Sequence, residues 1–323
     1  MIAATPLSIL QQAAAWAASP AGAVLVTLAG IEGSSARAMG TLMAVSGAGG
    51  FAGSLSGGCL EAALVAEAQA VLAAGRGWVT RYGAGSRFID LRLPCGGGID
   101  VLYTPLGDGA AVAAAAARLA ARQPAALRLD GAGARLADPP GAGGWQAGAF
   151  WLPLVPRLRL MLFGQGAELV ALARLAAHFG AEVVAHSPSA EDLALLAAEG
   201  MAGVRLESTG RLPPMVGDRW SAVVFLFHDR DWEAALLPPA LGLSAFYHGA
   251  VGSARTHRAR LERLARAGVD AARLEGGIGL IASTRDPASL ALSVLAQVVG
   301  RYQALCPPPQ AAPAPQLVAT THG

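Results

Sequence analysis

Residues 158–169, LRLMLFGQGAEL, join an apolar run to a glycine turn and then to a helical pattern. The run 158–163 is typical of a buried strand, and apolar residues at helical spacing follow from Ala167. Glycines at 164 and 166 permit a tight turn and the close approach of a phosphate to the N-terminus of the next helix. The stretch therefore predicts the first strand, turn and helix of a Rossmann-like α/β domain.

Strands and helices continue to alternate after this stretch. Apolar runs predict further strands at residues 182–185, 222–227 and 244–247. Helical patterns occupy residues 167–179, 190–198, 255–267 and 287–302. Because this alternation is typical of a parallel, doubly wound sheet, we expect a Rossmann-like domain over residues 157–305. The proline-rich residues 306–323 cannot pack a core, and we expect a disordered tail there.

The chain before residue 157 has a different pattern. Helices are expected at residues 6–18, 60–73 and 110–122, and strands at 23–28, 41–45, 78–82 and 99–104. These elements predict an N-terminal α+β domain over residues 1–122. A Gly/Pro cluster interrupts the apolar residues that follow, so residues 123–156 are interpreted as a β-hairpin and linker.

The composition argues against several classes of protein. Hydrophobic residues make up 54% of the 323 residues and charged residues 14%, which predicts a largely folded chain with few surface charges. A formal charge of +2 and the lack of a basic run argue against a nucleic-acid partner. The N-terminus indicates neither a signal peptide nor a membrane anchor. Cys59, Cys95 and Cys306 form no CxxC pair, so we expect a reducing cytoplasm and no disulfide framework.

The turn at Gly164 and Gly166 matches a dinucleotide-binding loop only in part. The third small residue of that fingerprint is replaced by Leu169, and His186 lies where a carboxylate would bind the ribose of NAD. The sequence therefore argues against NAD(P). Two alternatives remain: the turn binds another phosphate-bearing ligand, or its glycines only let the strand and the helix pack. His186 could donate to such a phosphate or could be a polar residue without that role.

A second glycine turn spans residues 247–253, YHGAVGS, between an apolar run and a helical pattern. Backbone N–H groups around Gly249 and Gly252 could bind an anion there, and Arg255 in the first helical turn could bind a phosphate through two N–H groups. Alternatively, Ser253 only caps the helix. Two such turns at the carboxyl ends of parallel strands can face one crevice.

Two cysteines lie in glycine-rich turns. The stretch 56–61, SGGCLE, places Cys59 at the start of a helical pattern, where the helix dipole favours the thiolate. Cys95 lies in residues 93–98, LPCGGG, whose glycines leave room for a bulky ligand. Thiolates are soft ligands suited to molybdenum and to sulfur chemistry, although either cysteine could be an inert buried residue. Nothing in the sequence suggests structural zinc or the GxSxG turn of a hydrolase.

Several motifs taken together resemble the XdhC/CoxI family. In the first half they are 32–40 (EGSSARAMG), 53–61 (GSLSGGCLE) and 94–97 (PCGG). In the second half they are 164–166 (GQG), 227–229 (FHD), 247–253 (YHGAVGS) and 277–280 (GIGL), which are similar to the Rossmann-like half of that family. The resemblance covers nearly all of residues 20–300. Ala36 and Gly277 replace prolines that are usual in the family and His186 replaces an acidic residue, departures that bear mainly on nucleotide binding.

The resemblance implies a chaperone and not a metabolic enzyme. Such a protein binds the molybdenum cofactor (molybdopterin), assists its sulfuration with a cysteine desulfurase, and inserts it into apo xanthine dehydrogenase or a related molybdenum hydroxylase. It also implies a homodimer. Cys59 and Cys95 are the expected metal contacts. The expected cofactor-binding residues are Ser56, Gly57, Gly58, Cys59, Glu61, Cys95, Gly96, Gly97, Gly164, Gly166, His228, Gly249, Gly252, Ser253 and Arg255.

Two alternative functions, and the role of one residue pair, stay open at this point. An NAD(P)-dependent oxidoreductase is suggested by the Gly164 turn, although Leu169 and His186 oppose it. An interaction scaffold could bridge desulfurase and target enzyme without holding cofactor, given the low surface charge. Finally, His228 and Asp229 match a His-Asp pair of the family at a strand's carboxyl end, but could serve only as a helix cap and a supporting hydrogen bond.

Overall fold

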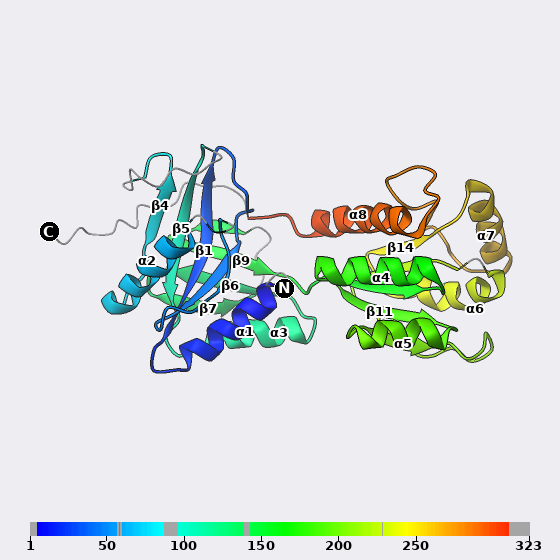
Figure 1. Ribbon diagram of the computed structural model, residues 1–323, viewed down its shortest axis with the longest axis horizontal. Coiled ribbons are helices and arrows are strands. Elements are labelled where there is room, and N and C mark those ends of the chain that lie inside the picture. The colour runs from blue at the N-terminus through cyan, green and yellow to red at the C-terminus, as the bar shows by residue number, and fades with distance from the viewer. Residues whose placement is uncertain are drawn as a thin grey trace. The chain divides into compact units, whose positions relative to one another are not determined.

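The computed structural model of the chain describes residues 5–56, 58, 60–86, 96–138, 143–227 and 229–309. The chain divides into two compact units, built on Ala3–Pro156 and Arg157–Pro307 (Figure 1). The expected α/β fold, an α+β unit followed by a Rossmann-like unit with a parallel sheet, is confirmed. Within the described part of the chain, no helix is both long and apolar enough to cross a bilayer. Residues 310–323 of the expected tail lie outside the described residues.

An antiparallel sheet with strand order β3-β2-β1-β5-β4 forms the centre of the N-terminal unit. Its strands are β1 (Ala23–Glu32), β2 (Leu42–Ser46), β3 (Phe51–Gly53), β4 (Val79–Gly83) and β5 (Gly98–Pro105). The central strand β1 is apolar on both faces because helices cover both of them. The face that carries Val24 packs against α2 (Glu61–Ala74), and the face that carries Leu25 packs against α1 (Pro6–Ala17) and α3 (Ala110–Ala120).

Residues 125–154 form a second antiparallel sheet where a hairpin and linker were expected. Its strands are β6 (Ala125–Asp130), β7 (Gly133–Ala137), β8 (Gly144–Gln146) and β9 (Ala149–Leu154), in the order β7-β6-β9-β8. Leu127 and Phe150 are fully buried in the same core as α1 and α3. The indole N–H of Trp145 donates to the carbonyl oxygen of Ala29 in β1 at 2.9 Å. The shared core makes this segment part of the N-terminal unit.

The second unit contains a parallel sheet of six strands in the order β12-β11-β10-β13-β14-β15. The strands are β10 (Arg159–Phe163), β11 (Glu182–Ser187), β12 (Ala202–Arg205), β13 (Ser221–Phe225), β14 (Tyr247–Ala250) and β15 (Leu274–Gly276). One core joins the sheet to α4 (Ala167–Phe179), α5 (Ala190–Ala198) and α8 (Pro287–Leu305). A separate core joins it to α6 (Arg230–Leu241) and α7 (Ala254–Arg266). The strand order reverses between β10 and β13.

Outside the second N-terminal sheet, four described elements were not predicted by the sequence patterns: β3, β12, β15 and α6. The three strands are only three or four residues long, too short for a clear alternation. Helix α6 contains Pro238 and Pro239, which interrupt its helical pattern. One predicted element is displaced, because β14 begins at Tyr247 and the apolar run had suggested a strand at 244–247. As a consequence, Gly249 lies within a strand and not in a turn.

Candidate functional site

The carboxyl ends of β10, β13 and β14 lie side by side at one edge of the parallel sheet. Phe163 pairs with Phe225, and Phe225 pairs with Ala250, so the three strands end in one row. Open α/β sheets bind ligands at this edge, where the strand order reverses. The structure thus brings the expected glycine turns to the same edge, separated by the segment that follows β13.

Gly164 has a packing role at this edge. A Cβ atom at this position would lie 2.8 Å from the Cβ of Leu226, which follows β13. The backbone is also hydrogen-bonded here, because Gly164 N–H donates to the carbonyl oxygen of His186 at 3.1 Å and Leu226 N–H donates to that of Phe163 at 2.7 Å. Glycine at 164 therefore lets two neighbouring chain segments approach each other.

Gly166 is the N-cap of α4, and a carboxylate of the same chain lies against it. Its N–H donates to Oδ2 of Asp192, in the first turn of α5, at 2.7 Å. Its φ of +79° favours glycine. Leu169, at the third position of the dinucleotide fingerprint, is fully buried in the core. One sequence feature places Asp192 in the first turn of α5. It lies three residues after Ser189, the N-cap of that helix, and the Asp192 N–H donates to the Ser189 hydroxyl.

His186, in β11, is buried against an aromatic ring. It is 2% exposed and its ring stacks on Phe163 with a centroid distance of 4.2 Å. Burial lowers the pKa of His186 to about 4, so the ring is neutral at physiological pH. This arrangement favours the interpretation in which His186 has no role toward a ribose.

Gly249 and Gly252 have different roles although they are close in the sequence. Within β14, a Cβ at 249 would lie 2.6 Å from Cε1 of Tyr247, so glycine makes room for that ring. The expectation that Gly249 forms part of an anion-binding turn is therefore not met. Gly252 is exposed and has a φ of +128°, which glycine adopts readily. It is followed by Ser253, the N-cap of α7.

Helix α7 begins with a capped and exposed turn. The Oγ atom of Ser253 accepts the N–H of Thr256 at 3.1 Å, as the capping alternative predicts. Arg255 lies in this first turn and is exposed. No acidic residue lies in it.

At the end of β13, Asp229 caps α6 by accepting the N–H of Asp231 at 2.8 Å. His228 lies outside the described residues.

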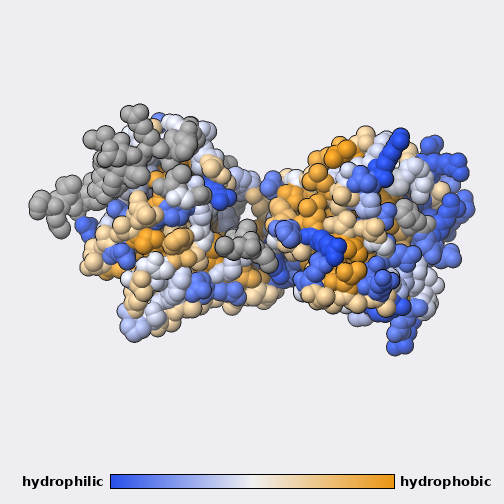
Figure 2. All heavy atoms as spheres, in the orientation of Figure 1, coloured by the Kyte–Doolittle hydropathy of each residue, from blue (hydrophilic) through white to orange (hydrophobic). Residues whose placement is uncertain are grey.

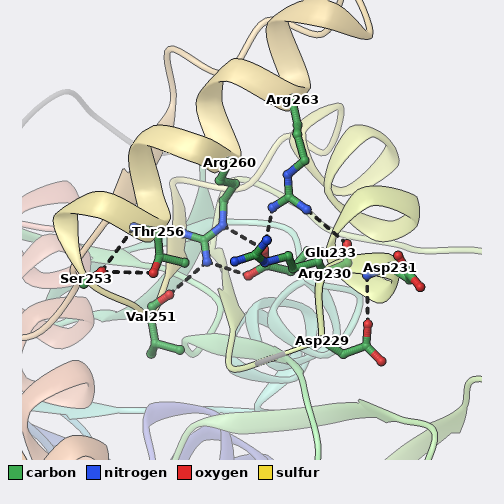
Figure 3. A network of polar contacts seen from close by, with 9 residues as sticks. All are labelled: Asp229, Arg230, Asp231, Glu233, Val251, Ser253, Thr256, Arg260 and Arg263. Atoms are coloured by element: carbon green, nitrogen blue, oxygen red, sulfur yellow. Dashed lines mark hydrogen bonds and ion pairs between the residues drawn. The ribbon is translucent and has the colours of Figure 1, made fainter.

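A buried ion pair joins α6 to α7 beneath this turn (Figure 3). Arg260 donates from Nε to Oε2 of Glu233 at 3.1 Å and from Nη2 to Oε1. Nη2 also donates to the carbonyl oxygen of Val251, just after β14, at 2.9 Å. The side chains of Arg260 and Glu233 are only 1% and 4% exposed. Sequence patterns carry no signal for this pair, because its members are 27 residues apart and α6 was not predicted.

In the N-terminal unit, the loop before α2 is folded around the carboxylate of Glu61. Oε1 accepts the hydroxyl of Ser54 at 2.6 Å, and Oε2 accepts the hydroxyl of Ser56 at 2.6 Å and the N–H of Gly58 at 2.8 Å. Burial raises the pKa of Glu61, but hydrogen bonds from Ser54 and Ser56 outweigh it and lower the pKa to about 2. Glu61 is thus an ionised carboxylate that holds the loop. Gly57 and Cys59 lie outside the described residues.

The other two N-terminal motifs meet at one end of the same sheet. Glu32, the last residue of β1, pairs with Gly98, the first residue of β5. A Cβ at Gly97 would lie 2.5 Å from the carbonyl oxygen of Ser34, so the two motifs are in close contact. Gly96 precedes this contact with a φ of +68°. Cys95 lies outside the described residues.

Helix α2 brings its preceding loop toward this end of the sheet. Near its C-terminus, Leu72 lies 3.4 Å from the Cβ position of Gly22, next to the start of β1. Since α2 packs along β1, its N-terminus at Glu61 is directed toward the opposite end of that strand.

The expected site residues therefore form two sets, one on each unit. Among the described residues, no three His, Cys, Asp or Glu side chains are grouped in a way that could hold a metal ion.

Comparisons with known proteins identify the family of this chain. The model of the XdhC Rossmann domain matches residues 160–298, and the model of the XdhC and CoxI family matches residues 16–83. The molybdenum cofactor insertion chaperone PaoD of Escherichia coli K12 is 36% identical over 282 residues, which cover 86% of this chain and 82% of that protein. A crystal structure described as a xanthine dehydrogenase from Bacillus halodurans has the same fold, with a TM-score of 0.74, 22% identity, and coverage of 93% of this chain and 96% of that one. The chain therefore belongs to the XdhC and CoxI family.

Proposed function

We propose that this protein is a chaperone that binds the molybdenum cofactor, assists its sulfuration with a cysteine desulfurase, and inserts it into apo xanthine dehydrogenase or a related molybdenum hydroxylase. Family membership and the E. coli relative, named as a molybdenum cofactor insertion chaperone, support this proposal. The same relationship supports an accessory role over catalysis of a metabolic reaction. We further propose that the protein acts as a cytoplasmic homodimer.

The observation that carries the proposal is the organised loop before α2. Hydroxyl and backbone N–H donors of Ser54, Ser56, Gly58 and Leu60 converge on Glu61, so the described residues before and after Cys59 are anchored. Cys59 precedes the helix by two residues, a position at which the helix dipole favours a thiolate. Because Glu61 is engaged by its own loop, we assign it a positioning role and not that of a cofactor ligand.

The cofactor has two chemically distinct parts, a soft metal centre and a phosphate. When bound, it supplies a soft metal with a dithiolene, the centre at which sulfur is added. Cys59 and Cys95 are the proposed thiolate contacts to that centre, since thiolates suit soft metals. A glycine turn of the Rossmann-like unit is a separate proposed binding position for a phosphate.

An NAD(P)-dependent oxidoreductase has less support. The N–H of Gly166, which would face a dinucleotide pyrophosphate, donates to Asp192. Leu169 fills the core at the position where the fingerprint has a small residue. Neither feature favours a nicotinamide cofactor.

Cofactor loading of cysteine variants tests the proposal. The purified full chain is incubated with the molybdenum cofactor, desalted, and its pterin measured by fluorescence after acid oxidation. We expect Cys59→Ala and Cys95→Ala to retain clearly less pterin than the unmodified chain. Cys306→Ala is the matched control, because this half-buried thiol lies at the end of α8 and outside the motifs, and it should retain pterin fully. Unchanged retention in both of the first two variants would contradict the thiolate role.

A further inference from the structure

The two glycine turns of the Rossmann-like unit differ in what lies at the N-terminus of the following helix. At the start of α4, Gly166 N–H already donates to the carboxylate of Asp192, and Glu168 adds a second acidic residue in the first turn. A phosphate bound there would meet two like charges at the place where the helix dipole favours an anion. The Asp192 carboxylate thus already occupies the place at the start of α4 where an anion would bind.

The first turn of α7, in contrast, carries a basic residue and no acidic one. The basic residue is Arg255, and the whole helix contains five arginines and a single glutamate. The N–H groups of Ala254 and Arg255 precede the first intrahelical hydrogen bonds, whereas the N–H of Thr256 is capped by Ser253. Residues 252–256 are exposed, and Figure 2 shows hydrophilic side chains over the α6 and α7 end of this unit. An anion can therefore approach this turn from solvent.

Arg260, beneath this turn, has a hydrogen-bond donor without an acceptor. The residue is 1% exposed, and its Nη1 atom is buried with no hydrogen-bond partner among the described residues. Buried guanidinium N–H groups are almost always paired, because an unpaired one costs free energy. The Cβ position of Gly252 is 3.2 Å from Thr256 Cγ2 and 3.7 Å from Arg260 Nη2, so the guanidinium lies directly under the turn (Figure 3).

Glu233 does not neutralise this cluster. Its carboxylate is shared between Arg260, through two hydrogen bonds, and Arg263, whose Nη2 lies 3.4 Å from Oε2. Two guanidinium groups against one carboxylate leave positive charge beneath the N-terminus of α7. The helix dipole adds to that charge, and burial reduces the screening of both.

We infer that the start of α7, residues 252–255 with Arg260 beneath them, binds a phosphate group, and that the start of α4 does not. The geometry at the start of α7 indicates an anion of the phosphate type and does not by itself identify the molecule that carries it. The identification of that anion as the phosphate of the molybdenum cofactor rests on the proposed function. The bound phosphate would supply the acceptor that Arg260 Nη1 lacks.

A pair of matched proline variants tests the site without cofactor. Ala254→Pro removes one N–H at the first position of α7, where proline is well tolerated, and Ala167→Pro makes the same change at the first position of α4. The full chain is titrated with inorganic phosphate by calorimetry at constant ionic strength. We expect A254P to weaken phosphate binding about tenfold and A167P to leave it unchanged. Equal effects of the two variants, or no binding by the unmodified chain, overturn the inference.

A double variant tests the part played by Arg260 while avoiding an unpaired buried charge. Glu233→Leu combined with Arg260→Met replaces the ion pair with apolar groups, a change that buried pairs often tolerate. Circular dichroism establishes that the double variant is folded. We expect it to bind inorganic phosphate about tenfold more weakly than the unmodified chain. Unchanged binding by the folded double variant would remove Arg260 from the site.

Cofactor loading separates the two sources of phosphate. If the start of α7 holds the cofactor's phosphate, A254P should also retain less pterin than A167P. If A254P loses inorganic phosphate but retains pterin fully, the cofactor assignment is overturned. An unmodified chain that binds inorganic phosphate at α7 but takes up no pterin contradicts the proposed function and leaves the phosphate site standing.

Discussion

Oδ2 of Asp192 accepts the backbone N–H of Gly166 at 2.7 Å, which joins the first turn of α5 to the N-cap of α4. A turn whose sequence is similar to a nucleotide-binding loop is thereby closed by a side chain of the next helix. The strand order is nevertheless that of dinucleotide-binding proteins. The Asp192 carboxylate therefore occupies the backbone N–H that would face the pyrophosphate of a dinucleotide in such a fold.

Asp192→Ala tests the energetic value of this contact. It removes a charge-assisted hydrogen bond at a helix N-terminus, and we expect the free energy of unfolding to fall by about 0.5–2 kcal/mol in urea denaturation. Glu191→Ala is the control, because this exposed neighbour lies in the same first turn of α5. Equal losses in the two variants would mean that the hydrogen bond to Gly166 contributes nothing beyond the helix dipole.

Glu233→Ala should destabilise the Rossmann-like unit strongly. It leaves Arg260 buried without its carboxylate, and breaking a buried pair in this way costs about 3–5 kcal/mol. The control is Glu262→Ala, which breaks the exposed pair with Arg266 and should cost less than about 1 kcal/mol. Chemical denaturation followed by fluorescence measures both. A small effect of Glu233→Ala would show that water or rearrangement satisfies Arg260.

The loop before α2 should respond to acid through Glu61. Its pKa is lower in the folded chain than its ordinary value of 4.5, so it stabilises the fold above that value. This contribution, at most about 3 kcal/mol, is lost as the pH falls from about 4.5 to about 2. Glu61→Gln should lower the free energy of unfolding at neutral pH and flatten its decline in acid. The same decline in the variant and the unmodified chain would contradict this account.

Two glycine-to-alanine substitutions should change stability in opposite directions. At Gly276 a Cβ would lie 2.0 Å from the ring of His257, so Gly276→Ala should lower the melting temperature. At Gly300, inside α8, nothing lies within 4 Å of the Cβ position, so Gly300→Ala should stabilise the helix by about 0.5–1 kcal/mol. Differential scanning calorimetry measures both. A destabilising Gly300→Ala would indicate a contact at that face of α8.

Periodicity predicted the long elements of the fold and missed the short ones. The predicted bounds of α4 and α5 agree with the structure, because their apolar residues recur at helical spacing and clear turns flank them. β15 is missed because three residues carry no periodic signal. The second sheet of the N-terminal unit is missed for another reason: its glycines and prolines suggest a linker, while the core that it shares with α1 is a tertiary feature.

The candidate site could be predicted only where its chemistry is local in the sequence. The Ser253 cap follows from the turn before α7, and it is present. The pairing of Glu233 with Arg260 could not be predicted, because it depends on how α6 and α7 pack. Asp192 lies within a predicted helix, yet its contact with Gly166 appears only once both turns are at the same sheet edge. The predictions for Gly57, Cys59, Cys95 and His228 remain predictions, since these residues lie outside those described.

The pterin content of the protein purified from cells that make the molybdenum cofactor tests the central claim most directly. Acid oxidation converts bound molybdopterin into a fluorescent product that can be counted per chain. Our account predicts a substantial fraction of chains with pterin, and little pterin in a variant carrying both Cys59→Ala and Cys95→Ala. Chains free of pterin, which also take up none when incubated with the cofactor, would contradict it.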